Sequence, residues 1–306
     1  MGEFEAFLET KVSECEEIIK SFLPKEEGYQ KTVIEAMNYS VMAGGKRLRP
    51  MLMHEFYTLL GGRNDKAVAP FMAAMEMIHT YSLVHDDLPA MDNDEYRRGR
   101  KTTHVVYGAG MATLAGDGLL NYAFETALKA YPFTRELSEL DGDVRDRFIY
   151  ALGILASKAG IYGMVGGQCA DIEDEGKSTL SEDEILFIHE NKTAALIESS
   201  MLIGAVLAGA DSNTLSKIER VGSNVGIAFQ IQDDILDIVG DQAVIGKPVG
   251  SDEKNEKVTY VTLHGIDESA KEVERLSNEA VEIVKGLGKE NEFLAELINY
   301  LISRNK

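Results

Sequence analysis

Apolar residues recur at steps of three and four positions through much of this chain, which is the spacing of one face of an α-helix. The clearest stretches are 33–41, 67–88, 144–159, 185–207 and 221–239. Strict two-residue alternation, the pattern of a half-buried strand, is scarce. Only six prolines occur and none lies within 133–247, so the strongest helix breaker is missing there. The pattern predicts long helices almost throughout.

Local signals refine this expectation. Ser181 followed by Glu184 forms a capping box, which predicts a helix start, and Pro70 lies near the start of another helix. The apolar segment 194–210 contains Glu198 and is shorter than the roughly 20 residues of a spanning helix. We expect it to be a buried core helix, with no membrane span in the chain. The segment 258–263 has strand propensity, but an isolated strand has no partner, so we expect a helix there too.

The chain shows no boundary that would divide it into domains. It has 306 residues, 44% of them hydrophobic, which suffices for a large core. No Pro-, Gly- or Ser-rich linker, internal repeat or low-complexity tract is present. We therefore expect one all-α domain over residues 1–306.

Charge and cysteine content exclude several functions. The 31 Lys and Arg residues face 51 Asp and Glu residues, a net charge of -20, which argues against a nucleic-acid partner or an anionic membrane surface. Two cysteines far apart in sequence exclude a disulfide scaffold and a cysteine zinc site. The segment 1–20 lacks the basic start and the unbroken apolar run of a secretory signal, so a cytoplasmic location is expected.

A first acidic cluster follows the apolar stretch 67–88 and contains Asp86, Asp87 and Asp92. Two negative charges about 4 Å apart repel by roughly 4 kcal/mol at an effective dielectric constant near 20, so an enclosed cluster calls for cations. Carboxylate oxygens suit divalent ions, and magnesium also favours substrate phosphate oxygens. Pro89 would clash with the carbonyl of His85 in a regular helix. We therefore expect the helix to end near Leu88 and an irregular turn to carry Asp92 back.

A second cluster, residues 230–237, contains Gln230, Asp233, Asp234 and Asp237. At about 100° per residue, Asp237 lies roughly 40° from Asp233 and roughly 60° from Asp234, so the three carboxylates share a helix face. Either cluster alone is also typical of a solvated acidic helix end. Two of them on apolar helices favour two helices that face each other across a cavity, with metal ions between them.

Positive charge is concentrated in two short runs. Residues 44–50 are Gly-Gly-Lys-Arg-Leu-Arg-Pro, and residues 97–101 hold four cations in five positions. Glycine permits close backbone approach to phosphate, and arginine binds phosphate oxygens in pairs; either run alone would more often be an exposed patch. Neither a P-loop nor a dinucleotide-binding glycine motif occurs, so nucleotides are disfavoured. His79 lies within about 20° of Asp86 on a helix and roughly 10 Å along the axis, so both can face one cavity.

These parts suit chemistry on diphosphates. Carboxylates for metal and separate cation runs indicate two phosphate-bearing groups, one bound through magnesium and one directly by Lys and Arg. An apolar helical cavity beneath them favours ionisation of an allylic diphosphate, because a dry pocket protects a carbocation. The chain has no nucleophile motif with a neighbouring base.

On these motifs the chain resembles the trans-isoprenyl diphosphate synthases, and most closely the bacterial farnesyl diphosphate synthases. The resemblance extends over nearly the whole length: 44–50, 79–104, 168–171, 192–193, 230–237 and 246–252 followed by Lys257. The first aspartate motif, two residues longer than D-D-x-x-D, is similar to the bacterial form. The resemblance implies a helical bundle around a central cavity and a homodimer.

It also implies a role for each motif. Three magnesium ions that grip the allylic diphosphate would be held by Asp86, Asp87, Asp92, Asp233, Asp234 and Asp237. The allylic group would be contacted or lined by Arg97, Gln168, Asp171, Lys192, Thr193, Gln230, Lys247 and Lys257. Isopentenyl diphosphate would bind Gly45, Lys46, Arg49, His79 and Arg98. Lys192, Thr193 and Gln230 would serve catalysis, and released pyrophosphate would take the proton.

Product length in this family depends on residues before the first aspartate. Tyr81, at the fifth position before Asp86, looks like the stopper for a fifteen-carbon product, with Ser82 beside it. On an ideal helix Ser82 shares the Asp86 face, whereas Tyr81 is turned roughly 140° away. Tyr81 would have to reach in from the pocket wall.

Three alternatives to a farnesyl diphosphate synthase remain: a geranylgeranyl diphosphate synthase, a class I terpene cyclase and a non-catalytic subunit of a heteromeric prenyl synthase. A cyclase would leave the run 44–50 without a function, and its second metal motif usually mixes Asn, Ser or Thr with Glu. A non-catalytic subunit tends to lose aspartates, and this chain keeps all six. Whether dimethylallyl diphosphate is accepted beside geranyl diphosphate is left open.

Overall fold

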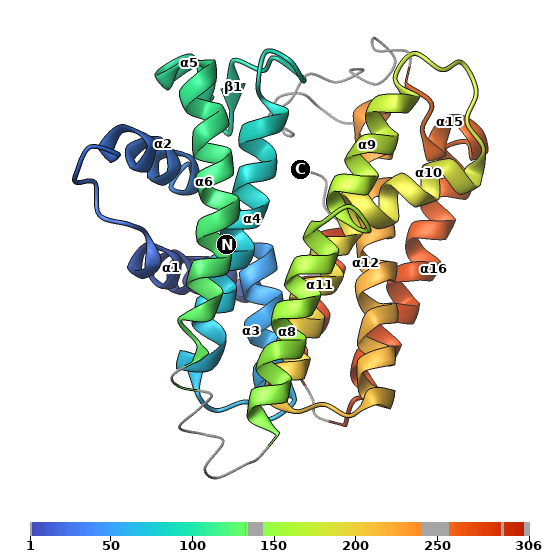
Figure 1. Ribbon diagram of the computed structural model, residues 1–306. Coiled ribbons are helices and arrows are strands. Elements are labelled where there is room, and N and C mark those ends of the chain that lie inside the picture. The colour runs from blue at the N-terminus through green and yellow to red at the C-terminus, as the bar shows by residue number, and fades with distance from the viewer. Residues whose placement is uncertain (1, 132, 134–142, 240–256, 289–290, 303–306) are drawn as a thin grey trace. The chain divides into compact units, whose positions relative to one another are not determined.

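The computed structural model describes residues 2–131, 133, 143–239, 257–288 and 291–302. These residues are almost wholly helical (Figure 1), which confirms the all-α class. Tertiary contacts divide the chain into two compact units, residues 1–152 and 153–306. A single domain over residues 1–306 stays a prediction.

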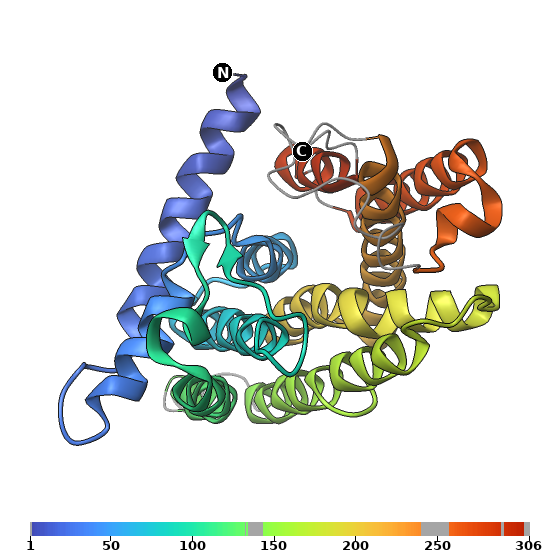
Figure 2. The same ribbon diagram turned by 90° about the horizontal axis from the view of Figure 1, so that it is seen from above.

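The first unit is built around α4. Its elements are α1 (Glu3–Phe22), α2 (Lys31–Val41), α3 (Leu48–Leu59), α4 (Asp65–Asp86), β1 (Tyr96–Arg97), β2 (Arg100–Lys101), α5 (Thr103–Tyr107), α6 (Ala109–Leu128) and the first half of α8 (Val144–Ala159). Helices α1, α2, α3 and α6 all contact α4, and Figure 2 shows α1 beside α3 and α4. Most α4 side chains from Ala67 to Val84 are buried, which is why its sequence is apolar on nearly every face.

Close packing of α4 on α6 depends on a glycine. A Cβ atom at Gly116 of α6 would overlap the ring of His85, so the absence of a side chain lets the two helices approach. His85 Nε2 lies 3.1 Å from the Thr113 carbonyl oxygen of α6. The end of α4 that carries Asp86 is thus held firmly.

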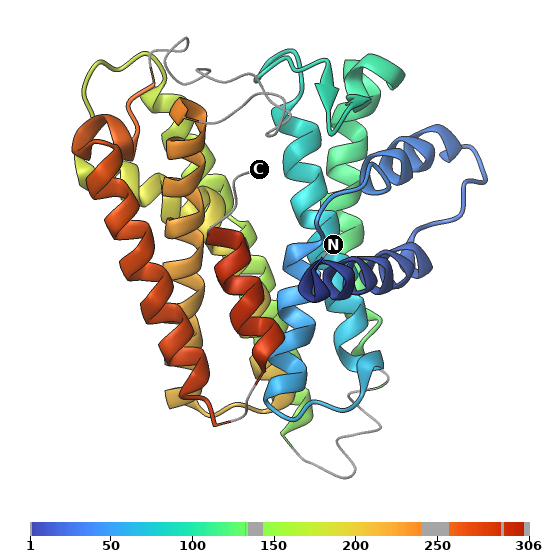
Figure 3. The ribbon, with the colours of Figure 1, turned by 180° about the vertical axis from the view of Figure 1, so that it is seen from behind.

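The second unit surrounds the long helix α12. Its elements are the rest of α8, α9 (Met164–Asp174), α10 (Glu182–Ile188), η1 (His189–Ala194), α11 (Ala195–Ala208), α12 (Ser212–Val239), α15 (Tyr260–His264), α16 (Ile266–Lys285) and α17 (Glu292–Ile302). Helices α11, α15, α16 and α17 contact α12, and Figure 3 shows α16 and α17 at its back. Every α11 residue from Ala195 to Val206 is buried, as expected for a core helix.

The predicted helices are present, with three differences. The predicted helix 185–207 contains a π-helical turn, η1, between α10 and α11. Pro70 is the sixth residue of α4, because Asn64 caps that helix by accepting a hydrogen bond from the Lys66 N–H. Residues 96–101 form a β-hairpin that the hydrophobic pattern does not reveal. The capping box at Ser181 and the helix within 258–263 are confirmed.

One described segment, 144–174, is long and apolar enough by composition to cross a membrane. In the structure it is two helices, α8 and α9, separated at residues 160–163. Length and hydropathy alone also describe core helices of proteins outside membranes.

Candidate functional site

The first aspartate motif lies where α4 ends. The helix stops at Asp86, two residues before the predicted point, and the Asp92 N–H donates a 2.9 Å hydrogen bond to the Asp86 carbonyl. The turn in between is closed by hydrogen bonds from the N–H groups of Met91 and Asn93 to the Leu88 carbonyl. Asp92 is therefore brought back to Asp86, as the sequence predicts.

Asp87 differs from its neighbour because it is buried and paired. Its Oδ1 accepts a 2.7 Å hydrogen bond from Arg97 Nε, and Arg97 Nη2 lies 2.5 Å away. Burial raises the pKa of Asp87 above its usual range, although Arg97 opposes this rise. The pair ties the aspartate motif to the hairpin.

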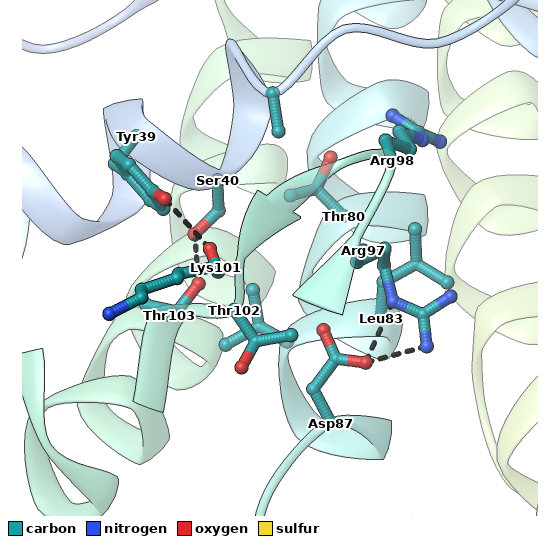
Figure 4. Close-up of a pocket in the computed structure, with 12 residues that line it drawn as sticks. Tyr39, Ser40, Thr80, Leu83, Asp87, Arg97, Arg98, Lys101, Thr102 and Thr103 are labelled. Carbon is teal, nitrogen blue, oxygen red and sulfur yellow. Dashed lines mark hydrogen bonds and ion pairs between the residues drawn. The ribbon is translucent and has the colours of Figure 1, made fainter. Parts of the chain in front are cut away.

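The hairpin presents Arg97 and Arg98 to different neighbours. Arg98 and Gly99 form its two-residue loop, and both have positive φ angles, 53° and 73°, the backbone of a type I′ turn. Figure 4 shows Arg97 directed to Asp87, while Arg98 lies away from it. The hairpin is anchored on α2, since Tyr39 donates a 2.7 Å hydrogen bond to the Lys101 carbonyl and Arg100 lies over the Tyr39 ring.

A pocket opens beneath this hairpin (Figure 4). Hydroxyl, carboxylate and guanidinium groups share its wall with apolar side chains. It is lined by Tyr39, Ser40, Ala43, Thr80, Leu83, Val84, Asp87, Arg97, Arg98, Lys101, Thr102 and Thr103.

Arg98 reaches the other basic run. Its guanidinium donates a hydrogen bond to the Gly44 carbonyl. A Cβ atom on Gly45, whose φ angle is 134°, would lie 2.5 Å from Arg98 Nη1. Only glycine fits at this position, so the backbone and the guanidinium come together as in an anion cradle.

Arg49 belongs to the same cluster. Its Nε is buried without a hydrogen-bond partner among the described residues, and such a donor calls for an acceptor. Burial, together with the charge of Arg98, lowers the pKa of Arg49 to about 10. An anion placed here would satisfy the donor and neutralise the charge. Lys46, at the edge of the cluster, is exposed.

His79 adds a neutral group to the cluster. Burial and then the charges of Arg49 and Arg98 lower its pKa well below 6.5. At neutral pH the ring therefore carries no charge and can donate one hydrogen bond to a phosphate oxygen. Of the residues predicted to bind isopentenyl diphosphate, Gly45, Arg49 and His79 are thus brought together around Arg98.

The predicted chain-length residues occupy different faces of α4. Tyr81 is buried with its ring edge-on to His85 at 5.8 Å between centroids, on the side that meets α6. Burial, then the charge of Asp86, raises its pKa to about 12. Ser82 is half-buried and donates a 2.9 Å hydrogen bond to the His79 carbonyl.

In the second unit, two lysines share one buried carboxylate. Lys192 of η1 bonds to Asp171 of α9, and Lys257 Nζ lies 2.8 Å from Asp171 Oδ1. Burial would raise the pKa of Asp171, but the two lysines hold it below its usual value. Gly167 allows this approach, because a Cβ there would overlap the backbone of Lys192.

The π-helical turn also contacts the second aspartate motif. Thr193 donates a 2.9 Å hydrogen bond to Gln230 Oε1, and Gln230 Nε2 lies 3.4 Å from Asp234 Oδ1. Gly226 of α12 permits the contact, since a Cβ there would overlap Ala194. π-helical turns within α-helices are frequent at functional sites.

The three aspartates of this motif are not equivalent. Asp234 is buried, accepts a 3.3 Å hydrogen bond from the Tyr260 N–H and lies 3.6 Å from His189 Nε2. Burial lowers the pKa of His189 to about 4, so its ring is neutral beside this carboxylate. Asp233 and Asp237 are partly exposed, as is Gln168. Lys247 lies outside the described residues.

The aspartate carboxylates of both motifs offer the oxygen ligands that magnesium prefers. Within the described ranges, no three Asp, Glu, His or Cys side chains converge on one metal position. Magnesium needs only one or two carboxylates when waters and phosphate oxygens complete its octahedron. The partly exposed pairs Asp86 with Asp92, and Asp233 with Asp237, are suitable donors of this kind.

Sequence reasoning missed several residues that shape these sites. In the sequence, His189 and Tyr260 are marked only by their position three residues from Lys192 and Lys257, respectively. Glu76 did give one, because it is the only formally charged residue within 67–85, and a charge in an apolar helix needs a partner.

Comparisons with known proteins agree on one family. The polyprenyl synthetase family model matches residues 30–300. The farnesyl diphosphate synthase of Geobacillus stearothermophilus is 46% identical over 265 residues, which are 85% of this chain and 84% of that protein. The geranylgeranyl diphosphate synthase of Cyanophora paradoxa is 40% identical over 301 residues, 97% of this chain and 96% of that protein.

A solved structure is similar over the same extent. The geranyltransferase of Helicobacter pylori, crystallised with magnesium and isoprenyl diphosphate, has a TM-score of 0.80 and 30% identity, covering 99% of this chain and 97% of that one. The predicted site residues described above all lie within the range 30–300 that the family model matches. The chain therefore belongs to the polyprenyl synthetase family and is a prenyltransferase of isoprenoid biosynthesis that condenses isopentenyl diphosphate with allylic diphosphates.

Proposed function

We propose that this enzyme is a farnesyl diphosphate synthase, which condenses isopentenyl diphosphate with geranyl diphosphate and also with dimethylallyl diphosphate. The observation that carries the proposal is the basic cluster around Arg98, which adjoins the first aspartate motif through the hairpin. A direct diphosphate site beside a carboxylate motif is what a two-diphosphate condensation needs and what a terpene cyclase does not.

Isopentenyl diphosphate binds at the basic cluster. The buried Nε of Arg49 donates to a phosphate oxygen, and Arg98, Lys46 and the Gly45 backbone contact the same group. Charge-assisted hydrogen bonds of this kind are the strong ones in proteins. Neutral His79 completes the site without adding repulsion between cations.

The allylic diphosphate binds at the aspartate motifs. Six carboxylates would hold magnesium, three ions in our proposal: Asp86, Asp87, Asp92, Asp233, Asp234 and Asp237. The similar Helicobacter pylori geranyltransferase, which was crystallised with magnesium, supports the choice of metal. When bound there, magnesium would neutralise the charge on the departing diphosphate. Arg97, Lys192, Lys247 and Lys257 contact the same group, and Gln168 and Asp171 line the pocket.

The side chains next to the allylic carbon stabilise charge and exclude water. Thr193 and Gln230 present oxygens to the cation that forms when the allylic C–O bond breaks. The isopentenyl double bond then attacks that carbon, and the resulting cation loses a proton to the released pyrophosphate. No side-chain base is required.

The test is turnover of labelled isopentenyl diphosphate with magnesium and either geranyl or dimethylallyl diphosphate. A fifteen-carbon diphosphate as main product supports the proposal. A twenty-carbon diphosphate indicates a geranylgeranyl diphosphate synthase, a hydrocarbon indicates a cyclase, and no turnover indicates a non-catalytic subunit.

Product length is proposed to depend on Tyr81. Tyr81→Ala removes a buried ring from the wall of α4, so products beyond fifteen carbons are expected in chromatography of the dephosphorylated alcohols. Ser82→Ala is the control, because it removes only a hydroxyl bonded to its own helix. An unchanged product from Tyr81→Ala contradicts this assignment.

We also propose a homodimer. Apolar side chains of the first unit are exposed on the single chain: Leu114, Leu128, Tyr131, Ile149 and Tyr150. Such exposure is typical of subunit interfaces. Light scattering should give twice the mass of 33.7 kDa, and Ile149→Glu with Tyr150→Glu should yield monomer.

A further inference from the structure

Arg47 stands within the basic run 44–50 but behaves unlike its neighbours. Lys46 is exposed and Arg49 has a buried Nε without a partner among the described residues, whereas the Arg47 side chain is fully buried and well bonded. Its Nη1 lies 2.7 Å from Glu76 Oε1, and its Nη2 donates a 2.7 Å hydrogen bond to the Val41 carbonyl. Glu16 Oε1 lies 3.3 Å from Nη2 as well.

The Arg47 backbone is held in an uncommon conformation. Its φ angle is 49° and its ψ angle 35°, the left-handed region that non-glycine residues seldom adopt. The surroundings must over-determine such a conformation for it to persist. The bonds from the guanidinium to Glu76 and Val41 supply that constraint, and they fix the chain between Gly45 and Arg49.

Glu76 is the acidic partner and lies on α4, three residues before His79. Only 2% of the residue is exposed, so its charge acts in a medium that screens little. The charge of Glu76 raises the pKa of Arg49 and of Arg98 against the effect of their burial. Glu76 therefore acts as a shared counter-charge to three guanidinium groups, while Glu16 adds a second carboxylate at Arg47 alone.

This arrangement reconciles two requirements. Arginines packed together repel one another, so they need a buried anion to remain close without substrate. Two carboxylates, Glu76 and Glu16, against the three arginines still leave the cluster positive, and a diphosphate is still attracted. Glu76 is bonded to Arg47. Of the three arginines, Arg47 is the one whose side chain is fully buried and cannot contact a ligand.

We propose that Glu76 is a positioning residue for isopentenyl diphosphate binding, acting through its ion pair with Arg47. The pair fixes residues 45–49 on α4, so that Gly45, Arg49 and His79 meet at Arg98. This inference rests on the proposed function, since it assigns isopentenyl diphosphate to the basic cluster.

The test compares Glu76→Gln with Glu55→Gln. Glu55 is also a buried carboxylate of the first unit, 3.0 Å from Lys11 Nζ, but it is bonded to α1. Both variants should lower the melting temperature. Glu76→Gln should weaken isopentenyl diphosphate binding at least tenfold by calorimetry, and raise its KM equally, with the KM for geranyl diphosphate changed less than twofold. Glu55→Gln should leave both KM values unchanged.

A purely electrostatic role predicts the opposite sign, because removing a negative charge would tighten binding of an anion. Tighter or unchanged binding by Glu76→Gln therefore overturns the proposal. Should Glu76→Gln not fold, Arg47→Lys keeps the charge but cannot reproduce the bonds from two guanidinium nitrogens, and it should show the same KM split. Absence of isopentenyl diphosphate binding by the unaltered enzyme would instead refute the proposed function.

Discussion

The two units hold their cations in different ways. In the first, Arg49 keeps a buried donor without a partner among the described residues, and the cluster has Glu76 as its deeply buried counter-charge. In the second, Lys192 and Lys257 are both bonded to Asp171. An anion can enter the first cluster directly, whereas in the second it competes with a carboxylate already in place. From this difference we expect one diphosphate site to bind its ligand without metal and the other to depend on metal.

The buried aspartates of the two motifs also differ in the groups that contact them. Asp87 of the first motif is neutralised by the guanidinium of Arg97. Asp234 of the second is held by the Tyr260 N–H and stands beside a neutral His189. Among the described contacts, Asp87 is thus paired with a cation, whereas those of Asp234 come from neutral groups.

Removal of divalent ions should have the largest effect. With EDTA, turnover should fall by about a thousandfold or more, since metal ions supply several kcal/mol to such transition states. Isopentenyl diphosphate binding, measured by calorimetry without metal, should change less than threefold. Loss of that binding with EDTA would break the comparison between the two units.

Arg49→Ala should have the next largest effect. A hydrogen bond to a charged group contributes about 1.5 to 3 kcal/mol, so the KM for isopentenyl diphosphate should rise about ten- to a hundredfold. The KM for geranyl diphosphate should stay within twofold. Arg63→Ala, at an exposed arginine of the same unit, is the control. Equal increases in both KM values would argue against a separate basic site.

Asp171→Asn tests the second unit. The variant should lose about 2 kcal/mol of unfolding free energy at pH 7, because two ion pairs are broken. The loss is no larger because both lysine side chains are partly exposed, so solvent screens their charges. The folded pKa of Asp171 is lowered below 3.8, so its stabilisation is complete above that pH and is lost as the pH falls through the lowered pKa. Urea titrations should show the difference from the unaltered protein shrinking below pH 3.8. A constant difference would contradict the charge pairing.

His79→Gln should have the smallest effect. The pKa of His79 is well below 6.5 in the folded protein, so below pH 6.5 only the unfolded chain binds this proton and stability falls. The contribution is about 1.4 kcal/mol one pH unit below 6.5. The variant, with no titrating ring, should show a flatter stability profile between pH 7 and pH 5.5 in urea titrations. A profile identical to that of the unaltered protein would mean that folding does not change the pKa of His79.

Much of the site could be predicted from particular residues. Pro89 predicted the end of α4 and the return of Asp92, because the proline ring and the missing N–H act locally. The hairpin could have been suspected from Arg98-Gly99, but a short polar hairpin carries no hydrophobic alternation. The π-helical turn at 189–194 carries no local signal, and the residues packed closely against it, Gly167 and Gly226, are far away in sequence.

The helical class, the acidic and basic motifs and the family could all be predicted from the sequence, because each depends on residue type at short spacing. Long-range packing buries Arg47 against Glu76, while Arg49 keeps a donor with no partner in the described part of the chain. It also buries Asp234 but leaves Asp233 partly exposed. Residues that are neighbours in sequence, such as Asp233 and Asp234, cannot be distinguished by a sequence motif. Their burial and bonding differ because different elements pack against them, and long-range packing decides which elements those are.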